Sequence, residues 1–179
     1  PYGTEILKFA AVLGLRVRER ALFSADERGM LGVLDDVNEV DVLNLLTPVE
    51  PKVRGLLFAG ADAVLANSSH EPFGLVGLET MAVKGIACIG NTGEDYAIAG
   101  YNAIVMESDD PREFIRLYAA LKASPARERA LKNAARRTAQ QYTWMKIIRR
   151  VLLPKFSALT GEPSAPLKQA ASRRLAPAV

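Results

Sequence analysis

The sequence contains a single cysteine, Cys88, and a single histidine, His70. One cysteine excludes an internal disulfide and any zinc cluster built from cysteines. One histidine excludes a metal site that needs several imidazole ligands. Cys88 lies in the apolar run 86–90, so we expect a buried, unreactive thiol.

Long apolar runs are also lacking. None approaches the roughly 18–20 residues that cross a bilayer, and no signal peptide is recognised at the start of the sequence. A length of 179 residues, with 49% hydrophobic and 24% charged residues, is typical of one ordinary domain with a sizeable core. We therefore expect a soluble, cytoplasmic protein.

The two parts of the chain carry opposite charge. Residues 1–111 contain 8 Lys and Arg against 17 Asp and Glu, a net charge of −9. Residues 112–179 contain 15 against 3, a net charge of +12. A basic region of this kind can meet nucleic acid, an anionic membrane surface or an acidic partner domain, or it can be a solvated helical face.

Strand-like and helix-like segments alternate over residues 40–106. The connections between them are short, which is typical of a parallel sheet flanked by helices. Before them, the apolar spacing from Glu5 to Leu15 predicts a helix that ends near Gly14, and a short strand is predicted at 20–24. The predicted strands are 40–47, 63–66, 86–89 and 103–106, and the predicted helices are 52–59, 74–83 and 95–99.

From residue 110 onward the pattern predicts helices only. Asp110-Pro111 and Ser124-Pro125 are start signals for helices that reach about residues 123 and 142. A third helix begins at Thr143, and its apolar stripe is expected to be core or an inter-domain surface. That stripe consists of Trp144, Ile147, Ile148, Val151 and Leu152.

We expect one domain over residues 1–160 and a flexible, basic Ala/Pro-rich tail over 161–179. A doubly wound sheet usually begins with a strand, whereas this sequence opens directly on a helix. The first strand of the domain is therefore expected to be missing, as in a piece cut from a longer protein.

Residues 71–79 carry two carboxylates, Glu71 and Glu79, on either side of Gly74. They join the predicted strand 63–66 to the predicted helix 74–83. The backbone N–H groups at such a turn favour phosphate, and a carboxylate beside it can accept hydrogen bonds from hydroxyl groups. Phosphates together with vicinal hydroxyls describe a nucleotide sugar.

The spacing suits a ligand several ångströms long. If the helix opens at Gly74, Glu79 lies about 7.5 Å along its axis, at roughly 1.5 Å per residue. Glu71 stays on the preceding loop, so the two carboxylates can flank a ligand without repelling each other. Gly74 has no side chain to block close approach of the backbone.

The segment from Leu56 to about Trp144 resembles the donor-binding half of retaining glycosyltransferases of family 4, which have two Rossmann-like domains in the GT-B architecture. The resemblance rests on an aspartate-bearing strand with a serine loop, Glu-x7-Glu, a Met-Ala motif, a further strand, a glycine-containing loop and two later landmarks. These are residues 61–69, 71–79, 80–85, 86–89, 92–94, 102–105 and 142–144. Lys84 stands where the family has glycine in the Met-Ala motif.

The resemblance implies an α/β fold, a Rossmann-like three-layer domain with a parallel sheet and a helical C-terminal part. Glu71, the candidate catalytic residue, would accept hydrogen bonds from the transferred sugar, and Glu79 from the ribose. The backbone of residues 73–75 would hold sugar and diphosphate oxygens. The full set of candidate donor-binding residues is Ser69, His70, Glu71, Phe73, Gly74, Leu75, Glu79, Thr92 and Gly93.

The implied donor substrate is a nucleotide-diphosphate sugar, without a metal or a further cofactor. The acceptor and the catalytic histidine would belong to an N-terminal domain, and the Arg and Lys that bind diphosphate in the family have no match at residues 1–15. We expect a hexosyltransferase as part of a longer parent, with this chain alone inactive. No nucleic-acid partner is expected, and the basic C-terminal helices are a candidate for peripheral membrane contact.

Two other functions remain open at this point. The first is a domain that keeps the fold and binds nucleotide sugar or a partner without transfer. The second is a glycoside hydrolase that uses Glu71 and Glu79 as an acid/base pair. The phosphate-type turn between the two carboxylates argues against the hydrolase.

Overall fold

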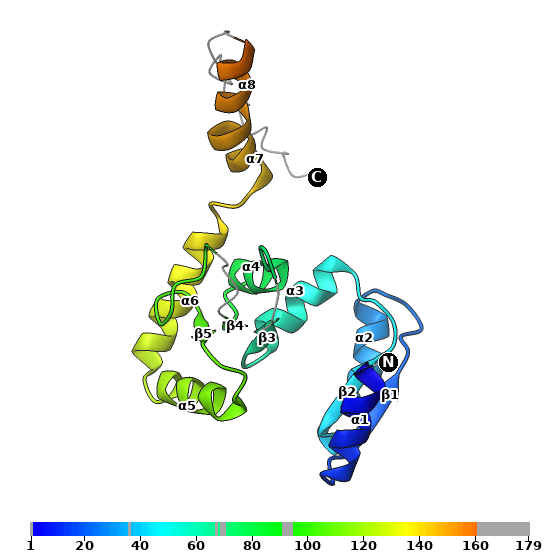
Figure 1. The fold of residues 1–179 in the computed structure, drawn as a ribbon. Coiled ribbons are helices and arrows are strands. Elements are labelled where there is room, and N and C mark those ends of the chain that lie inside the picture. The colour runs from blue at the N-terminus through cyan, green and yellow to red at the C-terminus, as the bar shows by residue number, and fades with distance from the viewer. Residues whose placement is uncertain (1, 36, 67, 69–70, 91–94, 161–179) are drawn as a thin grey trace, which may run out of the picture. The chain divides into compact units, whose positions relative to one another are not determined.

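The computed structural model describes residues 2–35, 37–66, 68, 71–90 and 95–160, and the chain divides into two compact units (Figure 1). The first unit, Pro1–Ala139, contains strands and helices, and the described part of the second, Gln140–Val179, is helical. Each paired strand runs parallel to its neighbour. The predicted α/β class with parallel strands is therefore confirmed.

A two-stranded sheet occupies the N-terminal part of the first unit. The strands align so that Val17 lies opposite Val42, and buried side chains of α2 and α3 form a small apolar cluster beside them. In chain order the elements are α1 (Tyr2–Val12), β1 (Val17–Arg20), α2 (Glu27–Leu34), a 3-10 helix (Val37–Glu39), β2 (Val42–Leu45) and α3 (Pro51–Gly60).

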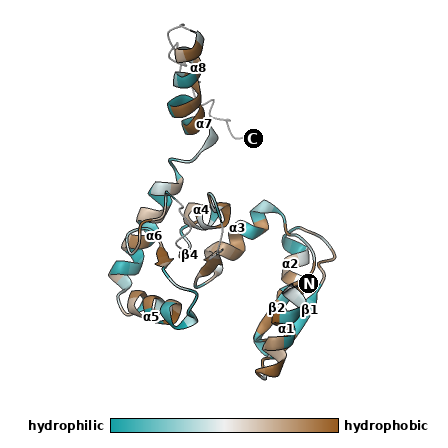
Figure 2. Cartoon of the chain, in the orientation of Figure 1, coloured by the Kyte–Doolittle hydropathy of each residue, from teal (hydrophilic) through white to brown (hydrophobic). Residues whose placement is uncertain are grey.

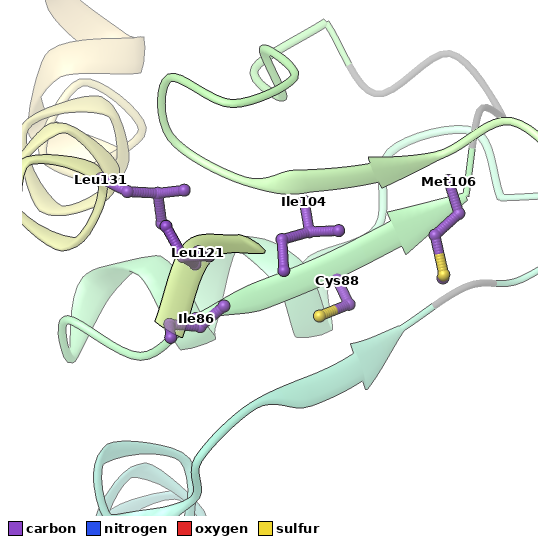
Figure 3. Packing of buried hydrophobic residues seen from close by; sticks show 6 residues of the cluster. All are labelled: Ile86, Cys88, Ile104, Met106, Leu121 and Leu131. Atoms are coloured by element: carbon purple, nitrogen blue, oxygen red, sulfur yellow. The ribbon is translucent and has the colours of Figure 1, made fainter. Parts of the chain in front are cut away.

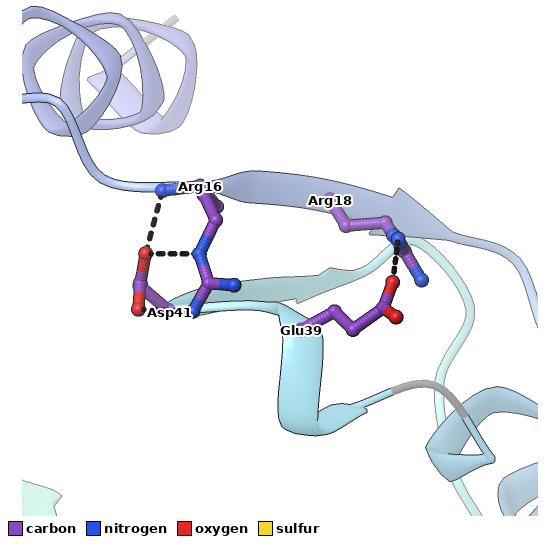
Figure 4. A network of polar contacts seen from close by, with 4 residues as sticks. All are labelled: Arg16, Arg18, Glu39 and Asp41. Atoms are coloured by element: carbon purple, nitrogen blue, oxygen red, sulfur yellow. Dashed lines mark hydrogen bonds and ion pairs between the residues drawn. The ribbon is translucent and has the colours of Figure 1, made fainter.

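Charged side chains connect the start of β1 to the start of β2 (Figure 4). The Asp41 carboxylate accepts hydrogen bonds from the backbone N–H of Arg16 at 2.8 Å and from its guanidinium at 3.0 Å. Arg18 and Glu39 form a looser pair at 3.8 Å. Hydrogen bonds from the Arg16 side chain and backbone lower the pKa of Asp41 to about 2.

The second sheet has three parallel strands in the order β3-β4-β5. Cys88 of β4 lies opposite Leu65 of β3 on one side and Ile104 of β5 on the other. The described strands thus form two sheets. The elements of this part are β3 (Val64–Ala66), α4 (Leu75–Ala82), β4 (Ala87–Gly90), β5 (Ile104–Met106), α5 (Pro111–Lys122) and α6 (Pro125–Ala139).

The core beside the second sheet is apolar (Figure 3). Its buried side chains are Ile86, Cys88, Ile104, Met106, Leu121 and Leu131. Apolar and polar residues alternate around α5 and α6, so each helix has one side suited to this core (Figure 2). The prediction of a buried thiol at Cys88 is confirmed, and burial raises the pKa of this thiol to about 12, in line with the expected low reactivity.

Two predicted elements differ from the structure. The helix predicted at 95–99 is a turn, because the Asn102 amide accepts a hydrogen bond from the Ile98 N–H and donates one to the Tyr96 carbonyl. These bonds hold the backbone in a non-helical course. The short strand predicted at 20–24 lies three residues earlier, at Val17–Arg20.

Helix α2 has no counterpart among the predicted elements. It contains Gly29 and Gly32, which lower helix propensity. The Asp26 side chain caps the helix by accepting a hydrogen bond from the Gly29 N–H at 3.1 Å. A Cβ at position 29 would lie 1.8 Å from the Ser24 carbonyl oxygen, so close packing requires this glycine. The other predicted elements are confirmed to within about three residues at each end.

The second unit contains one helical run of three parts: α7 (Trp144–Ile147), a π-helical turn (Ile148–Leu152) and α8 (Leu153–Thr160). Trp144 is 78% exposed, so it is not a core residue of this unit, and the inter-domain alternative for its stripe stays a prediction. Across the described residues, every helix is too short or too polar to cross a membrane. The tail predicted at 161–179 lies outside the described residues.

Candidate functional site

The two candidate carboxylates lie between β3 and β4, on the loop and helix that follow β3. Glu71 is on the loop and is half-buried. Its carboxylate has no hydrogen bond or ion pair within the described part of the chain. Glu79 lies in the second turn of α4. A half-buried carboxylate with no partner among the described residues can accept hydrogen bonds from a ligand.

Gly74 begins α4 in the left-handed conformation, with φ 68° and ψ 66°. Residues other than glycine rarely adopt this backbone conformation. Glycine is therefore required here for its backbone conformation, as well as for close approach of a ligand to the backbone. The carbonyl of Gly74 accepts a hydrogen bond from the Tyr96 hydroxyl. The Phe73 ring packs edge-on against Tyr96, with ring centroids 5.6 Å apart.

The first turn of α4 carries no side-chain cap. The backbone N–H groups of Leu75, Val76 and Gly77 begin the helix, and such groups have no acceptor within their own helix. The helix dipole adds partial positive charge at the same end. Together these properties favour an anion such as phosphate at this position.

A chain of hydrogen bonds holds Tyr96 in place. The buried Asn102 amide donates to the Tyr96 carbonyl at 2.8 Å and to the Thr138 hydroxyl of α6 at 3.0 Å. A Cβ at Gly77 would lie 2.7 Å from the Tyr96 hydroxyl oxygen. Close packing of α4 on Tyr96 therefore fixes the start of α4, where the N–H groups are exposed to a ligand.

Glu79 is held by a residue that the sequence did not indicate. The Arg54 guanidinium of α3 donates to both carboxylate oxygens of Glu79, at 2.9 Å and 2.8 Å. Both side chains remain partly exposed, 37% for Arg54 and 41% for Glu79. Residues so far apart in sequence carry no spacing signal. The predicted helix 52–59 carries two cations, Lys52 and Arg54, and nothing in the sequence distinguishes Arg54 from Lys52.

The end of α4 shows why glycine would suit position 84, where this chain has lysine. The Gly85 N–H donates to the Thr80 carbonyl and the Lys84 N–H to the Met81 carbonyl, which is the Schellman pattern at a helix end. This pattern places Lys84 at φ 62°, the left-handed position that glycine usually occupies. Lys84 is exposed.

The structure places Glu71, Phe73, Gly74, Leu75 and Glu79 on one continuous loop and helix. The remaining candidates lie outside the described residues; they are Ser69, His70, Thr92 and Gly93. Among the residues that are described, no group of three or more His, Cys, Asp or Glu is arranged to hold a metal ion.

A family model for glycosyl transferases group 1 matches residues 43–138, slightly more than half of the chain. The chain is also similar to the D-inositol 3-phosphate glycosyltransferase of Geodermatophilus obscurus, with 30% identity over 110 residues. The match covers 60% of this chain and 24% of that protein. The chain thus spans about a quarter of the length of this curated relative.

Solved structures show a similar fold. Sucrose-phosphate synthase from Thermosynechococcus elongatus matches with a TM-score of 0.60 and 18% identity, over 82% of this chain and 39% of that one. Anabaena HepE in complex with UDP-glucose matches with a TM-score of 0.57 and 15% identity, over 87% of this chain and 53% of that one. These likenesses concern the fold.

Proposed function

The chain belongs to the glycosyl transferases group 1 family, and from this premise we propose that it binds the nucleotide-sugar donor of a retaining, family 4 glycosyltransferase. The acceptor is bound by an N-terminal domain of the same parent protein. The transferred sugar is a hexose, and the chain is inactive alone because the acceptor site lies in that other domain.

One observation carries this proposal: the Glu71 carboxylate, which has no hydrogen-bond or ion-pair partner among the described residues, lies on the loop that leads into the uncapped start of α4. In the proposal, Glu71 accepts hydrogen bonds from hydroxyls of the transferred sugar, and Glu79 from the ribose. The backbone N–H groups of Phe73, Gly74 and Leu75 bind sugar and diphosphate oxygens. The order of these groups along the chain matches the order sugar, diphosphate, ribose in the donor.

The same groups suit the chemistry of transfer. The bond between the sugar and the diphosphate breaks through an oxocarbenium-like state, while negative charge builds on the departing diphosphate. Backbone donors and the positive end of α4 stabilise that charge more in the transition state than in the ground state. The fixed start of α4 keeps these donors in place without reorganisation.

The solved relatives agree with a nucleotide-sugar ligand. HepE of Anabaena has been solved with UDP and with UDP-glucose, and these ligands support a nucleotide-diphosphate sugar for the present chain. The curated relative is a glycosyltransferase by name.

A binding test uses the protein expressed from its complete gene. Titration calorimetry with UDP-, ADP- and GDP-glucose is expected to show binding of one of them. Gly74→Ala should weaken that binding at least roughly tenfold, because the left-handed start of α4 must shift. Gly14→Ala is the matched control: Gly14 is also left-handed, at φ 79°, with no atom near its Cβ position. Failure of all three donors to bind would refute the proposal.

A non-catalytic domain that binds nucleotide sugar is the alternative function. The two functions differ in turnover. A transferase releases the nucleotide from its donor, slowly when water is the acceptor and faster when the sugar acceptor is present. Nucleotide release by the protein from its complete gene supports transfer. Tight donor binding without any release would favour the alternative.

The helical run at 144–160 is a proposed peripheral contact with an anionic membrane. It has no acidic residue, and Trp144, Phe156 and Leu159 are largely exposed. Its cations are Lys146, Arg149, Arg150 and Lys155. Such a segment binds lipid through apolar and basic side chains together. Salt-sensitive binding to phosphatidylserine vesicles, and not to phosphatidylcholine vesicles, tests this; no binding at any salt concentration would favour docking on the parent protein.

A further inference from the structure

We propose that Arg54 is a positioning residue that holds Glu79 in the geometry that recognises the ribose of the donor. The inference rests on the proposed function, in which Glu79 accepts hydrogen bonds from ribose hydroxyls. Arg54 belongs to α3 and Glu79 to α4, and 25 positions separate them in the sequence. The pair therefore depends on the packing of two helices.

The geometry of the pair fixes the carboxylate plane. Arg54 donates from Nε to one Glu79 oxygen at 2.9 Å and from an Nη nitrogen to the other at 2.8 Å. Two parallel N–H bonds from a planar guanidinium allow one orientation of the carboxylate, whereas a single bond leaves it free to rotate. A lysine could not impose this restriction.

The pair also leaves the carboxylate able to bind a ligand. A carboxylate offers about four lone-pair sites on its two oxygens, and Arg54 occupies one on each. Glu79 is 41% exposed, so the remaining sites are within reach of an outside donor. The lone pair left on each oxygen points away from the guanidinium, so either oxygen can accept a hydrogen bond from a ribose hydroxyl.

Both side chains extend from fixed backbone. Val53, next to Arg54, is 2% exposed and belongs to the apolar cluster beside the first sheet. Thr80 and Met81, which follow Glu79, are fully buried. The positions of the two Cα atoms are thus set by packing, and the ion pair removes the remaining freedom of the glutamate. Ligand binding then has less side-chain entropy to overcome.

A neighbouring ion pair provides the control. Lys52, two positions before Arg54 in α3, contacts Glu27 of α2 at 2.7 Å. Lys52 is 77% exposed and has a single contact with its partner, so it is an ordinary surface pair. Removing this cation changes the charge of the same helix turn without touching α4.

The test compares ribose with its dideoxy form in the protein expressed from its complete gene. UDP, ADP and GDP, each paired with its 2′,3′-dideoxy counterpart, are titrated by calorimetry against wild type, Arg54→Met, Arg54→Lys, Lys52→Met and Glu79→Ala. Thermal melting checks that each variant is folded. The readout is the ratio of the affinity for the ribonucleotide to the affinity for its dideoxy form. A general loss of structure would weaken both affinities and leave this ratio unchanged.

We expect wild type to prefer the ribonucleotide by roughly tenfold or more, because hydrogen bonds to a charged group are lost in the dideoxy form. Glu79→Ala should abolish this preference. Arg54→Met should reduce it by roughly three- to tenfold through lost preorganisation, with unchanged affinity for the dideoxy form. The preference of Arg54→Lys should lie between those of Arg54→Met and wild type, and the preference of Lys52→Met should equal that of wild type.

The outcomes separate the two proposals. If Glu79→Ala abolishes the preference and Arg54→Met leaves or increases it, the positioning role is refuted and the proposed function stands. If the preference persists in Glu79→Ala, Glu79 does not recognise the ribose, and the assignment under the proposed function fails together with the positioning role. An effect of Lys52→Met as large as that of Arg54→Met would reduce the role of Arg54 to its charge and would also refute the inference.

Discussion

The two sheets of the first unit are stabilised by different interactions. In β1 and β2 every residue is exposed or half-buried, and exposed ion pairs such as Arg16–Asp41 join the strands. In β4 and β5 most residues are buried, and their side chains form an apolar core with α5 and α6. The candidate site lies beside the second sheet, next to the better-buried strands.

This difference bears on where a precise site can be built. Apolar burial contributes about 25 cal/mol per Å², whereas exposed ion pairs contribute about 0–1 kcal/mol each. The candidate loop follows β3, which is not a buried strand, so its fixed point is the packing of α4 on the buried strand β4, where a Cβ at Gly77 would lie 2.8 Å from the Ile89 side chain. Tyr96 and Asn102 extend that order to Gly74 through hydrogen bonds. Three predictions follow this comparison, from the largest expected effect to the smallest.

Truncation of Ile86 should have the largest effect. Ile86 is fully buried in the core beside the second sheet, so Ile86→Ala should lower the free energy of unfolding by about 2–5 kcal/mol. Leu43 of β2 is only half-buried, and Leu43→Ala should cost about 1 kcal/mol. Urea unfolding monitored by circular dichroism measures both. Equal losses would remove the distinction between the two sheets.

A gain in stability is expected at Lys84. Its left-handed backbone at φ 62° is unfavourable for a residue with a Cβ, so Lys84→Gly should stabilise the protein by about 1 kcal/mol. Lys84→Ala removes the same charge and keeps the strain, so it serves as the control. The increase in melting temperature should appear in Lys84→Gly alone. A similar increase in Lys84→Ala would assign the effect to the charge.

The smallest effect is expected for the ion pair of the first sheet, and it depends on pH. The pKa of Asp41 falls from the ordinary 3.8 to about 2 in the folded protein, so the folded state favours the carboxylate. The contribution of this ion pair to the stability of the folded state is therefore complete above about pH 4 and is lost as the pH falls through about 2. Urea unfolding of wild type and Asp41→Asn should differ at neutral pH and converge near pH 2. A difference that grows on acidification would contradict this sign.

The sequence predicts the parts of the fold that depend on local pattern. Apolar periodicity locates α3, α4 and α5, and Asp110-Pro111 marks the start of α5, where the Asp110 side chain does cap the helix. The turn at Gly74 follows from its place between the strand at 63–66 and the helix at 74–83. These features need only neighbouring residues, so one sequence is enough to indicate them.

Features that depend on distant contacts could not be predicted. The helix expected at 95–99 is absent because Asn102 binds the backbone of that segment. The two glycines of α2 lower its helix propensity, so the sequence did not predict this helix. Gly29 is nevertheless required, because a Cβ there would collide with the Ser24 backbone. Arg54 meets Glu79 only through the packing of α3 and α4. For the candidate site, the sequence indicated which residues are candidates to bind a ligand, whereas the structure shows that Arg54 holds Glu79 and that Tyr96 holds Gly74.

The central claim is that Glu71 recognises the transferred sugar and Glu79 the ribose of one donor. Calorimetric titration of wild type, Glu71→Gln and Glu79→Ala with UDP and with UDP-glucose, or with the pair whose base the protein prefers, tests it most directly. Glu71→Gln is expected to remove the extra affinity for the nucleotide sugar and to leave nucleotide affinity unchanged, whereas Glu79→Ala should weaken both ligands equally. Equal weakening of both ligands by Glu71→Gln, or no change in either variant, would contradict the claim.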